Sequence, residues 1–347
     1  MSTVELSESG TAGRWLLLIH QIPAKPAYVR VRIWRRLQAL GAITVKNSVY
    51  ALPANEQTQE DFEWLLKEIT GDGGETLICE ARLVGGLSDL EVRAMFNLAR
   101  DAEYDAVAKE ARELAGRLSG QPQLPPRGDA LSRLAKLRAE LTRIAAIDFF
   151  GANGRETVAG LLAGLSTRLV QNRPLPVVQE GMAATGPLKG RVWVTRAGVH
   201  VDRIASAWLI RRFVDPEARF KFVAVTGYVP EQGELRFDMS EAEFTHVGDQ
   251  CTFEVLRMRA GLTDPALVAI AEIVHDIDLK DGKFGREEAA GIARLIEGIA
   301  AAHADDGCRI ERGSAVFDDL HAYFDKAQTY TSGPLVRPRQ ARRQVEG

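Results

Sequence analysis

The sequence predicts an α+β protein made of a small N-terminal sheet domain, a helical middle region and a C-terminal mixed α/β domain. Strand-length apolar runs alternate with helical periodicity over residues 14–86, and helical periodicity alone continues over 87–171. Strand-like runs return after a stretch rich in proline and glycine at 172–190, which we take as a linker. We expect a flexible leader at 1–13, a C-terminal domain at 191–330 and a mobile tail at 331–347.

The N-terminal domain is predicted to follow a β-α-β-β-α-β order. Its first helical pattern places Val29, Ile33, Leu37 and Leu40 on one face and ends at Gly41. Strands are expected at 15–19, 42–45, 48–52 and 76–81, and a second helix at 57–70. That order is the ferredoxin-like plan.

The middle region carries an apolar stripe that could join two copies of the chain. Leu134, Leu137, Leu141 and Ile144 recur with a 3-4-3 spacing, which makes this stripe a candidate dimer seam. In the C-terminal domain the pattern predicts a strand at 191–195, a helix at 203–213 and a strand at 220–225. At least three more helices should follow.

Composition and cysteine usage indicate a cytoplasmic protein without a membrane segment. The 347 residues carry 44 basic and 47 acidic side chains, so a wholly basic protein is excluded. Cys79, Cys251 and Cys308 lie far apart, which is neither a disulfide framework nor a CxxC zinc motif. The N-terminus lacks the pattern of a secretory signal, and no apolar run is long enough to span a bilayer.

Positive charge is segregated in one part of this slightly acidic chain. Residues 14–55 contain seven basic side chains and no acidic one. On a helix, Arg32, Arg35 and Arg36 share an arc of about 100° beside the apolar stripe. Because like charges so close together are destabilising, an anionic partner such as the phosphate backbone of DNA is expected. The alternative is a solvated helix face.

A second basic feature follows the first strand of the C-terminal domain. A glycine-bearing loop and a helix come after Thr195, and Asp202 is a plausible N-cap of that helix. A strand–loop–helix junction can direct backbone N–H groups toward an anion, and Arg196 and Arg203 would add two guanidinium groups. The alternative is a pair of surface arginines bridged to Asp202 or Asp215.

Residues typical of metal sites also occur in this domain. Glu254, His275 and Asp278 are a candidate ligand set, with His275 and Asp278 one helical turn apart. No HExxH or CxxC motif accompanies them, so a polar network is the alternative. Cys251 is either a small buried residue or a redox-responsive thiol.

Several long motifs in this sequence resemble the ChrB family of chromate-resistance regulators. They include Trp15-Leu-Leu-Leu-Ile-His-Gln-Ile-Pro through Arg35-Arg36-Leu37, Asn47-Ser-Val-Tyr-Ala-Leu-Pro53, Asp202-Arg203-Ile-Ala-Ser-Ala-Trp208 through Pro216, 246–254 and Gly261-Leu-Thr-Asp-Pro-Ala266. The resemblance covers nearly the whole chain apart from the leader, the linkers and the tail.

The resemblance implies a cytoplasmic, DNA-binding repressor of chromate-efflux genes that is released when chromate is present. It implies that chromate is the effector and that the protein is a regulator rather than an enzyme. We expect no cofactor, and a bound metal ion is the alternative. Carried onto this sequence, it assigns DNA contact to Arg30, Arg32, Arg35 and Arg36, and chromate sensing to Arg196, Arg203 and His246. We expect Lys46 to contact DNA as well. We expect a homodimer on operator DNA. The competing hypothesis is a metal-dependent or redox enzyme that uses the histidine, cysteine and acidic residues of the C-terminal domain.

Overall fold

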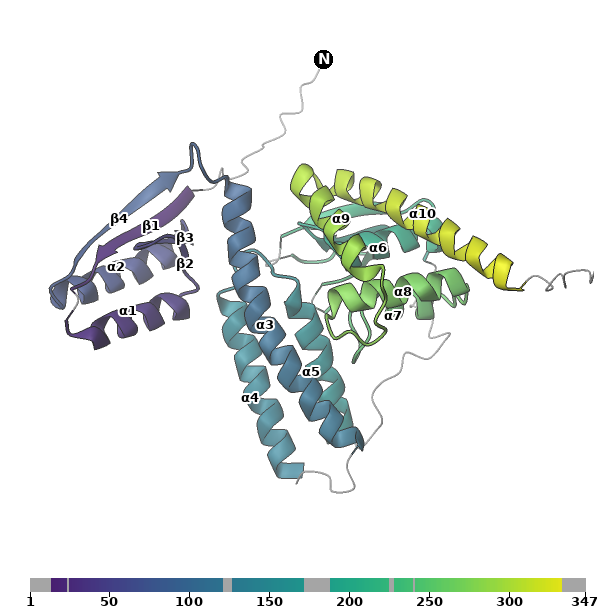
Figure 1. Cartoon of the computed structure of the whole chain (residues 1–347), viewed down its shortest axis with the longest axis horizontal. Coiled ribbons are helices and arrows are strands. Elements are labelled where there is room, and N and C mark those ends of the chain that lie inside the picture. The colour runs from purple at the N-terminus through teal and green to yellow at the C-terminus, as the bar shows by residue number, and fades with distance from the viewer. Residues whose placement is uncertain are drawn as a thin grey trace, which may run out of the picture. The chain divides into compact units, whose positions relative to one another are not determined.

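The computed structural model describes residues 14–23, 25–120, 127–171, 188–224, 228–239 and 241–332. These residues form an α+β protein with two separate sheets, which confirms the expected fold class (Figure 1). One compact unit combines Met1–Val177 with His246–Asp249, and the other combines Val178–Thr245 with Gln250–Gly347. The expected leader and most of the expected linker and tail lie outside the described residues. Within the described ranges, no helix has the length and apolar content needed to cross a membrane.

The first unit begins with a four-stranded antiparallel sheet in the order β2-β3-β1-β4. Its elements are β1 (Arg14–Gln21), α1 (Ala27–Ala39), β2 (Ile43–Lys46), β3 (Val49–Pro53), α2 (Glu56–Gly71) and β4 (Glu75–Arg82). This is the β-α-β-β-α-β order that the sequence predicts. Both helices lie on one face of the sheet (Figure 1), where Leu18 of β1 packs in one core with Ile33, Leu37 and Phe62.

Local sequence signals account for the ends of both helices. The buried residues Val29, Ile33 and Leu37 recur every four positions in α1, which ends before Gly41 with its φ of +73°. α2 begins with a capping box: Asn55 Oδ1 accepts from Thr58 N at 2.9 Å, and Thr58 Oγ1 accepts from Asn55 N at 3.2 Å.

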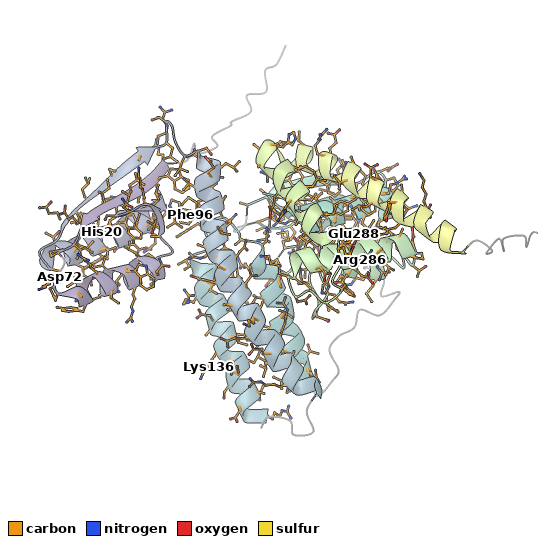
Figure 2. The ribbon with its side chains drawn as sticks, in the orientation of Figure 1. His20, Asp72, Phe96, Lys136, Arg286 and Glu288 are labelled. Carbon is orange, nitrogen blue, oxygen red and sulfur yellow. The ribbon has the colours of Figure 1, made fainter. Side chains whose placement is uncertain are left out.

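The opposite face of the sheet is only partly covered. Phe96 of α3 (Asp89–Gly120) stacks on Trp15 of β1 with 5.8 Å between ring centroids, and Phe150 packs against both rings. Figure 2 shows Phe96 between α3 and the sheet. Farther along the same face, Ile19 and Leu77 are 37% and 51% exposed. An apolar strip therefore remains uncovered along β1 and β4 in the described part of the chain.

The rest of the first unit is a three-helix bundle of α3, α4 (Arg127–Ala146) and α5 (Gly154–Gln171). Leu134, Leu137 and Ile144 of the 3-4-3 stripe are buried among the side chains of this bundle, and Leu141 packs half-buried against them. The stripe is therefore not the free surface that a dimer seam needs. The sequence pattern shows only that one face is apolar, whereas its neighbours in the chain's own fold decide what covers that face.

The second unit is built on a three-stranded parallel sheet in the order β6-β5-β7. Its elements are β5 (Val192–Arg196), α6 (Val201–Leu209), the π-helix η1 (Ile210–Val214), β6 (Arg219–Val223), β7 (Glu234–Arg236), α7 (Thr252–Arg259), α8 (Pro265–Asp278), α9 (Ala289–Ala302) and α10 (Asp306–Ser332). The sequence missed β7 because three residues carry no readable periodicity. The helix expected at 203–213 begins two residues earlier and ends as η1.

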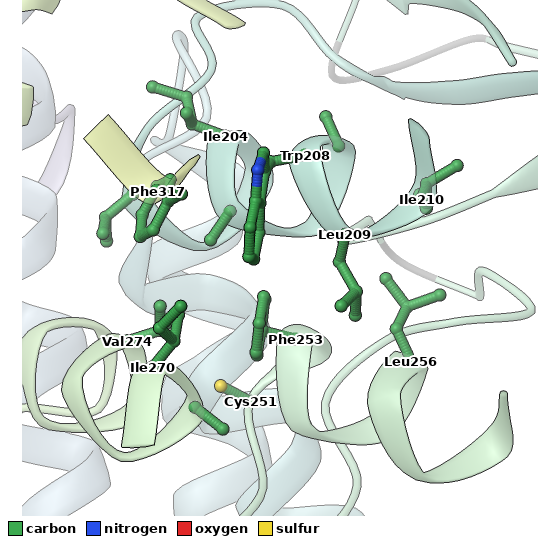
Figure 3. Packing of buried hydrophobic residues seen from close by; sticks show 14 of the residues in the cluster. Ile204, Trp208, Leu209, Ile210, Cys251, Phe253, Leu256, Ile270, Val274 and Phe317 are labelled. Atoms are coloured by element: carbon green, nitrogen blue, oxygen red, sulfur yellow. The ribbon is translucent and has the colours of Figure 1, made fainter. Parts of the chain in front are cut away.

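The core of the second unit centres on Trp208 of α6 (Figure 3). Its ring stacks on Phe253 of α7 at 6.4 Å between centroids and tilts against Phe317 of α10 at 5.7 Å. α6 is buried on every side, so its polar residues must find partners inside the protein. These partners determine which groups surround Arg196 and Arg203, the arginines of the candidate oxyanion site.

Candidate functional site

The basic face of α1 keeps some of its expected DNA-binding residues available. Arg30 and Arg35 on α1 are exposed, as is Lys46 at the end of β2. Among the described residues, none of these three takes part in an ion pair. Their charge is therefore free to meet an external anion.

The other two arginines of α1 are held by α2. Arg32 Nε lies 2.8 Å from Glu68 Oε1, and its guanidinium also binds Asp72, which Figure 2 labels at the end of α2. Arg36 Nε lies 3.6 Å from Glu68. The hydrogen bond to Asp72 raises the pKa of Arg32 above its ordinary value. The expected crowding of uncompensated charge on this arc is thus wrong in part, because acidic residues of α2 offset it.

Aromatic side chains accompany these arginines. Tyr28, Val31, Arg32, Arg35 and Arg36 line a shallow groove along α1, and the Arg32 guanidinium lies 5.7 Å from the centre of the Tyr28 ring. Trp34 is also exposed, at 53%. Exposed rings next to arginines can stack on bases or sugars while the guanidinium groups contact phosphates.

The loop after β5 has the expected shape, but the protein itself supplies its anion. Gly198 adopts a φ of +77°, and its N–H donates to Asp306 Oδ2 at 2.7 Å. Val199 N donates to the other oxygen of Asp306 at 2.8 Å, and Ala197 N donates to Val223 O at 2.9 Å. The backbone donors of this loop are therefore already used.

Arg203 and Arg196 are interior residues, each 2% exposed, and not the surface pair that the alternative hypothesis describes. Arg203 Nε donates to Asp238 Oδ2 at 3.0 Å, and its Nη1 donates to three backbone oxygens, those of Arg196, Ala197 and Gly198, at 3.0–3.4 Å. Asp238 also accepts from Thr252 Oγ1 at 3.0 Å. Arg203 thus ties the end of β5 to the segment after β7.

The expected N-cap is wrong. His200, not Asp202, occupies the N-cap position of α6, because the helix begins at Val201. The Asp202 carboxylate instead accepts from the backbone nitrogens of Thr252 and Phe253 at 2.8 and 2.9 Å, where it caps α7. Burial, together with the positive charges of Arg203 and Arg309, lowers the pKa of His200 to about 4, so its ring is neutral at neutral pH.

Both ends of the chain match family models. Residues 193–324 match the family model described as "ChrB, C-terminal domain", and residues 30–120 match "Protein ChrB, N-terminal". The chain belongs to the ChrB family. It is 29% identical over 322 residues to "Protein ChrB" of Cupriavidus metallidurans, which covers 89% of this chain and 95% of that relative. No solved structure matches this ChrB family member.

Membership of the ChrB family supports an association with chromate resistance. The N-terminal match begins at Arg30 and therefore includes the four arginines of α1. The C-terminal match includes Arg196 and Arg203 together with Asp238 and Asp306. The two family matches thus cover both the basic face of α1 and the buried arginine site of the second unit.

The candidate metal ligands of this ChrB protein are not brought together as a set. His275 Nδ1 lies 2.7 Å from Glu254 Oε2, and the carboxylate that faces its Nε2, at 3.4 Å, is that of Asp281 rather than Asp278. Glu254 also accepts from Cys251 N at 2.8 Å. Among the described residues, no group close enough to share a metal combines Glu254, His275 and Asp278. The arrangement is a buried polar network.

Cys251 and His246 differ in how far the structure bears on their expected roles. Cys251 is fully buried in the core that Figure 3 shows, and burial raises the pKa of its thiol well above the ordinary value, which disfavours the reactive thiolate.

His246 is buried and belongs to the segment His246–Asp249 of the first unit, where it packs closely against Gly160 of α5. Its role in chromate sensing stays a prediction.

Sequence reasoning missed the residues that satisfy the two sites. Glu68 and Asp72 lie more than 30 positions from the arginines they bind. Asp238 lies 35 positions from Arg203, and Asp306 lies 108 positions from Gly198. No spacing rule connects such pairs. The one available signal was physical: an arginine in the first turn of a helix opposes the helix dipole and needs an acidic partner.

Proposed function

We propose that this chain is a chromate-responsive transcriptional repressor of a chromate-resistance (efflux) operon. The observation that carries the proposal is the surface of α1, where Arg30 and Arg35 stand exposed beside Tyr28 and Trp34 in a segment without acidic residues. A regulator with this surface needs no catalytic group, and operator DNA in the cytoplasm is its polyanionic partner.

On DNA, the five basic residues would have different roles. Arg30, Arg35 and Lys46 would contact phosphates directly. Arg32 and Arg36, which Glu68 and Asp72 already hold, would add less to the affinity but would keep α1 in place. Because phosphate contacts release counterions, the affinity should fall steeply with salt, by a log–log slope of about −0.9 per contact.

In the second unit, chromate would take the place of a carboxylate. Chromate is a tetrahedral dianion whose oxygens can accept from the N–H groups of Gly198 and Val199, where Asp306 now binds, or from Arg203, where Asp238 now binds. Arg196 completes the proposed sensing set of this unit, and the predicted role of His246, which belongs to the first unit, is tested separately by its own substitution. Since Asp306 is the first residue of α10, its displacement would release the start of that helix.

This exchange offers a source of switching energy. A repressor that goes from mostly bound to mostly free needs a ligand that favours the released state by about 3–5 kcal/mol. Charge-assisted hydrogen bonds formed with chromate in only one state are of that size, at about 1.5–3 kcal/mol each. An effector that bound both states equally would not switch the protein.

The test is a gel shift with the DNA upstream of the protein's own gene at about 50 and 200 mM salt. We expect a complex that weakens with salt and that chromate, but not an equal concentration of sulfate, dissolves. The variant Arg30→Ala/Arg35→Ala should lose about 10-fold or more in affinity. The variant Lys136→Ala/Arg138→Ala removes the same charge from the exposed face of α4 and should bind like the wild type. The absence of a complex, or one that ignores chromate, contradicts the proposal.

A further inference from the structure

Among the described residues, no strand pairs with the outer side of β4, which lies at the end of the order β2-β3-β1-β4. Its eight residues contain no proline or glycine, and three of them, Glu75, Glu80 and Arg82, are charged. Natural proteins usually protect such an edge by shortening the strand, by adding charge or by covering it, because unpaired backbone groups recruit another strand.

The alternation of hydrogen bonds along the sheet shows which backbone groups of β4 can pair with another strand. His20 N donates to Ser48 O and Ala54 N donates to Arg14 O, so the even-numbered residues of β1 bond to the β3 side. The odd-numbered residues of β1 therefore bond to β4, through its positions 77, 79 and 81. It follows that β4 directs the N–H and C=O groups of Thr76, Ile78, Glu80 and Arg82 away from the sheet.

An apolar strip runs beside this edge. Leu77 is 51% exposed and lies directly opposite Ile19 of β1, while Cys79 lies opposite Leu17. These side chains share the face that α1 and α2 leave open, and Phe96 covers that face only around Trp15. A strand added at β4 would extend both the hydrogen-bonded ladder and this apolar strip.

We propose that β4 pairs in antiparallel fashion with β4 of a second copy of this chain, around a two-fold axis at Cys79. In this register Cys79 lies opposite the partner's Cys79, Leu77 opposite the partner's Ala81, and Thr76 opposite the partner's Arg82. The outward groups of each strand then meet those of the other, as an antiparallel ladder requires. Apolar side chains face apolar ones across the axis on the open face.

Charge favours this register over the one centred on Glu80. The acidic Glu80 lies opposite the partner's Ile78, so no like charges meet directly. A shift that centres the axis on Glu80 would place two carboxylates opposite each other, which is destabilising. The strand is thus self-complementary, and this identifies a second copy as the partner.

One consequence rests on the proposed function. A two-fold axis perpendicular to the sheet leaves α1 of both copies on the same face of the extended sheet. α2 contacts β1 and β4, so α1 covers the strands farther from the axis, and the two copies of α1 would lie about 24–34 Å apart at about 4.8 Å per strand. Successive major-groove segments on one side of DNA repeat about every 34 Å.

The experiment measures the mass of the full chain in solution by light scattering, without DNA or chromate. We expect a dimer that Leu77→Lys converts to a monomer, because the substitution adds charge to the pairing strand. Val84→Lys adds the same charge at an 86% exposed residue just beyond β4 and should remain dimeric. Circular dichroism should show that both variants are folded.

Cross-linking tests the register in the protein with its β4 sequence intact. In Cys308→Ser, the exposed thiol is removed while Cys251 stays buried, so oxidation by copper phenanthroline should link two chains through Cys79. The additional change Cys79→Ser should abolish the link. A monomeric wild type, a Leu77→Lys variant that stays dimeric, or a dimer that does not cross-link at Cys79 would each overturn the proposal. A dimer that fails to bind DNA would overturn only the proposed function.

Discussion

The carboxylate of Asp306 receives the backbone N–H groups of both Gly198 and Val199, at 2.7 and 2.8 Å, across more than 100 residues of sequence. Two adjacent backbone N–H groups of this kind are the donors that would bind a small oxyanion at such a loop. An internal carboxylate thus occupies the place that the sequence suggested for an external ligand. The stability of this unit and the chromate binding that we propose for it therefore depend on the same donors.

Asp306→Ala should destabilise the second unit by about 2–4 kcal/mol, because it leaves the N–H groups of Gly198 and Val199 without their acceptor. It also removes the 3.4 Å contact of Arg309 Nη1, while the rest of that guanidinium keeps its hydrogen bonds to two backbone carbonyls. Asp305→Ala is the matched control: its exposed carboxylate accepts only from the turn that starts α10, and its loss should cost about 1 kcal/mol. Urea unfolding of the purified variants measures both effects. Equal losses would show that Asp306 acts only as a helix cap.

Arg203→Met should cost about 3–5 kcal/mol, because it removes the guanidinium that forms an ion pair with the buried Asp238 carboxylate. Asp238 keeps the hydrogen bond from Thr252 Oγ1. Arg203→Lys should not restore the stability, since an ammonium group cannot reach both Asp238 and the three carbonyls that the guanidinium binds. Arg212→Ala removes an exposed pair with Asp318 at 3.5 Å and should cost less than about 1 kcal/mol. Thermal melts rank the variants, and an Arg203→Lys variant as stable as the wild type would refute the prediction.

The neutral ring of His200 should make stability depend on pH. Its folded pKa of about 4 lies below the ordinary value of 6.5, so the unfolded chain takes up a proton first as the pH falls. The contribution is fully present above pH 6.5 and is lost between 6.5 and about 4, to a total of about 3 kcal/mol. Unfolding of wild type and His200→Asn across this window measures the difference between them. Parallel curves would exclude the effect.

Two glycines should respond oppositely to alanine. At Gly41, φ is +73° and an added Cβ would lie 2.7 Å from Ile147 Cβ, so Gly41→Ala should cost about 2–4 kcal/mol. At Gly116, in the exposed interior of α3, an added Cβ meets nothing within 4 Å, so Gly116→Ala should stabilise by about 0.5–1 kcal/mol. Denaturant midpoints check both signs. A tolerated alanine at position 41 would mean that the turn after α1 relaxes.

Much of the fold could be predicted because it rests on short-range patterns. The spacing of Val29, Ile33 and Leu37 defines α1, and the β-α-β-β-α-β order follows from alternating periodicities. The pattern failed where an element is short, as in β7, and where one helix changes type, as at η1. It also could not show that the Leu134–Ile144 stripe is covered by the chain's own helices.

For the two candidate sites, too, some features follow from the sequence and others from the folded structure. The sequence by itself determined that arginines gather in the segment before residue 55 and flank the loop after β5, because charge and local spacing are properties of neighbouring residues. Only the tertiary structure decided which of them keep a free charge: α2 brings Glu68 and Asp72 to α1, and the segments after β7 and at the start of α10 bring Asp238 to Arg203 and Asp306 to Gly198. Compensation of charge depends on distance in space, which the chain sets only when it folds.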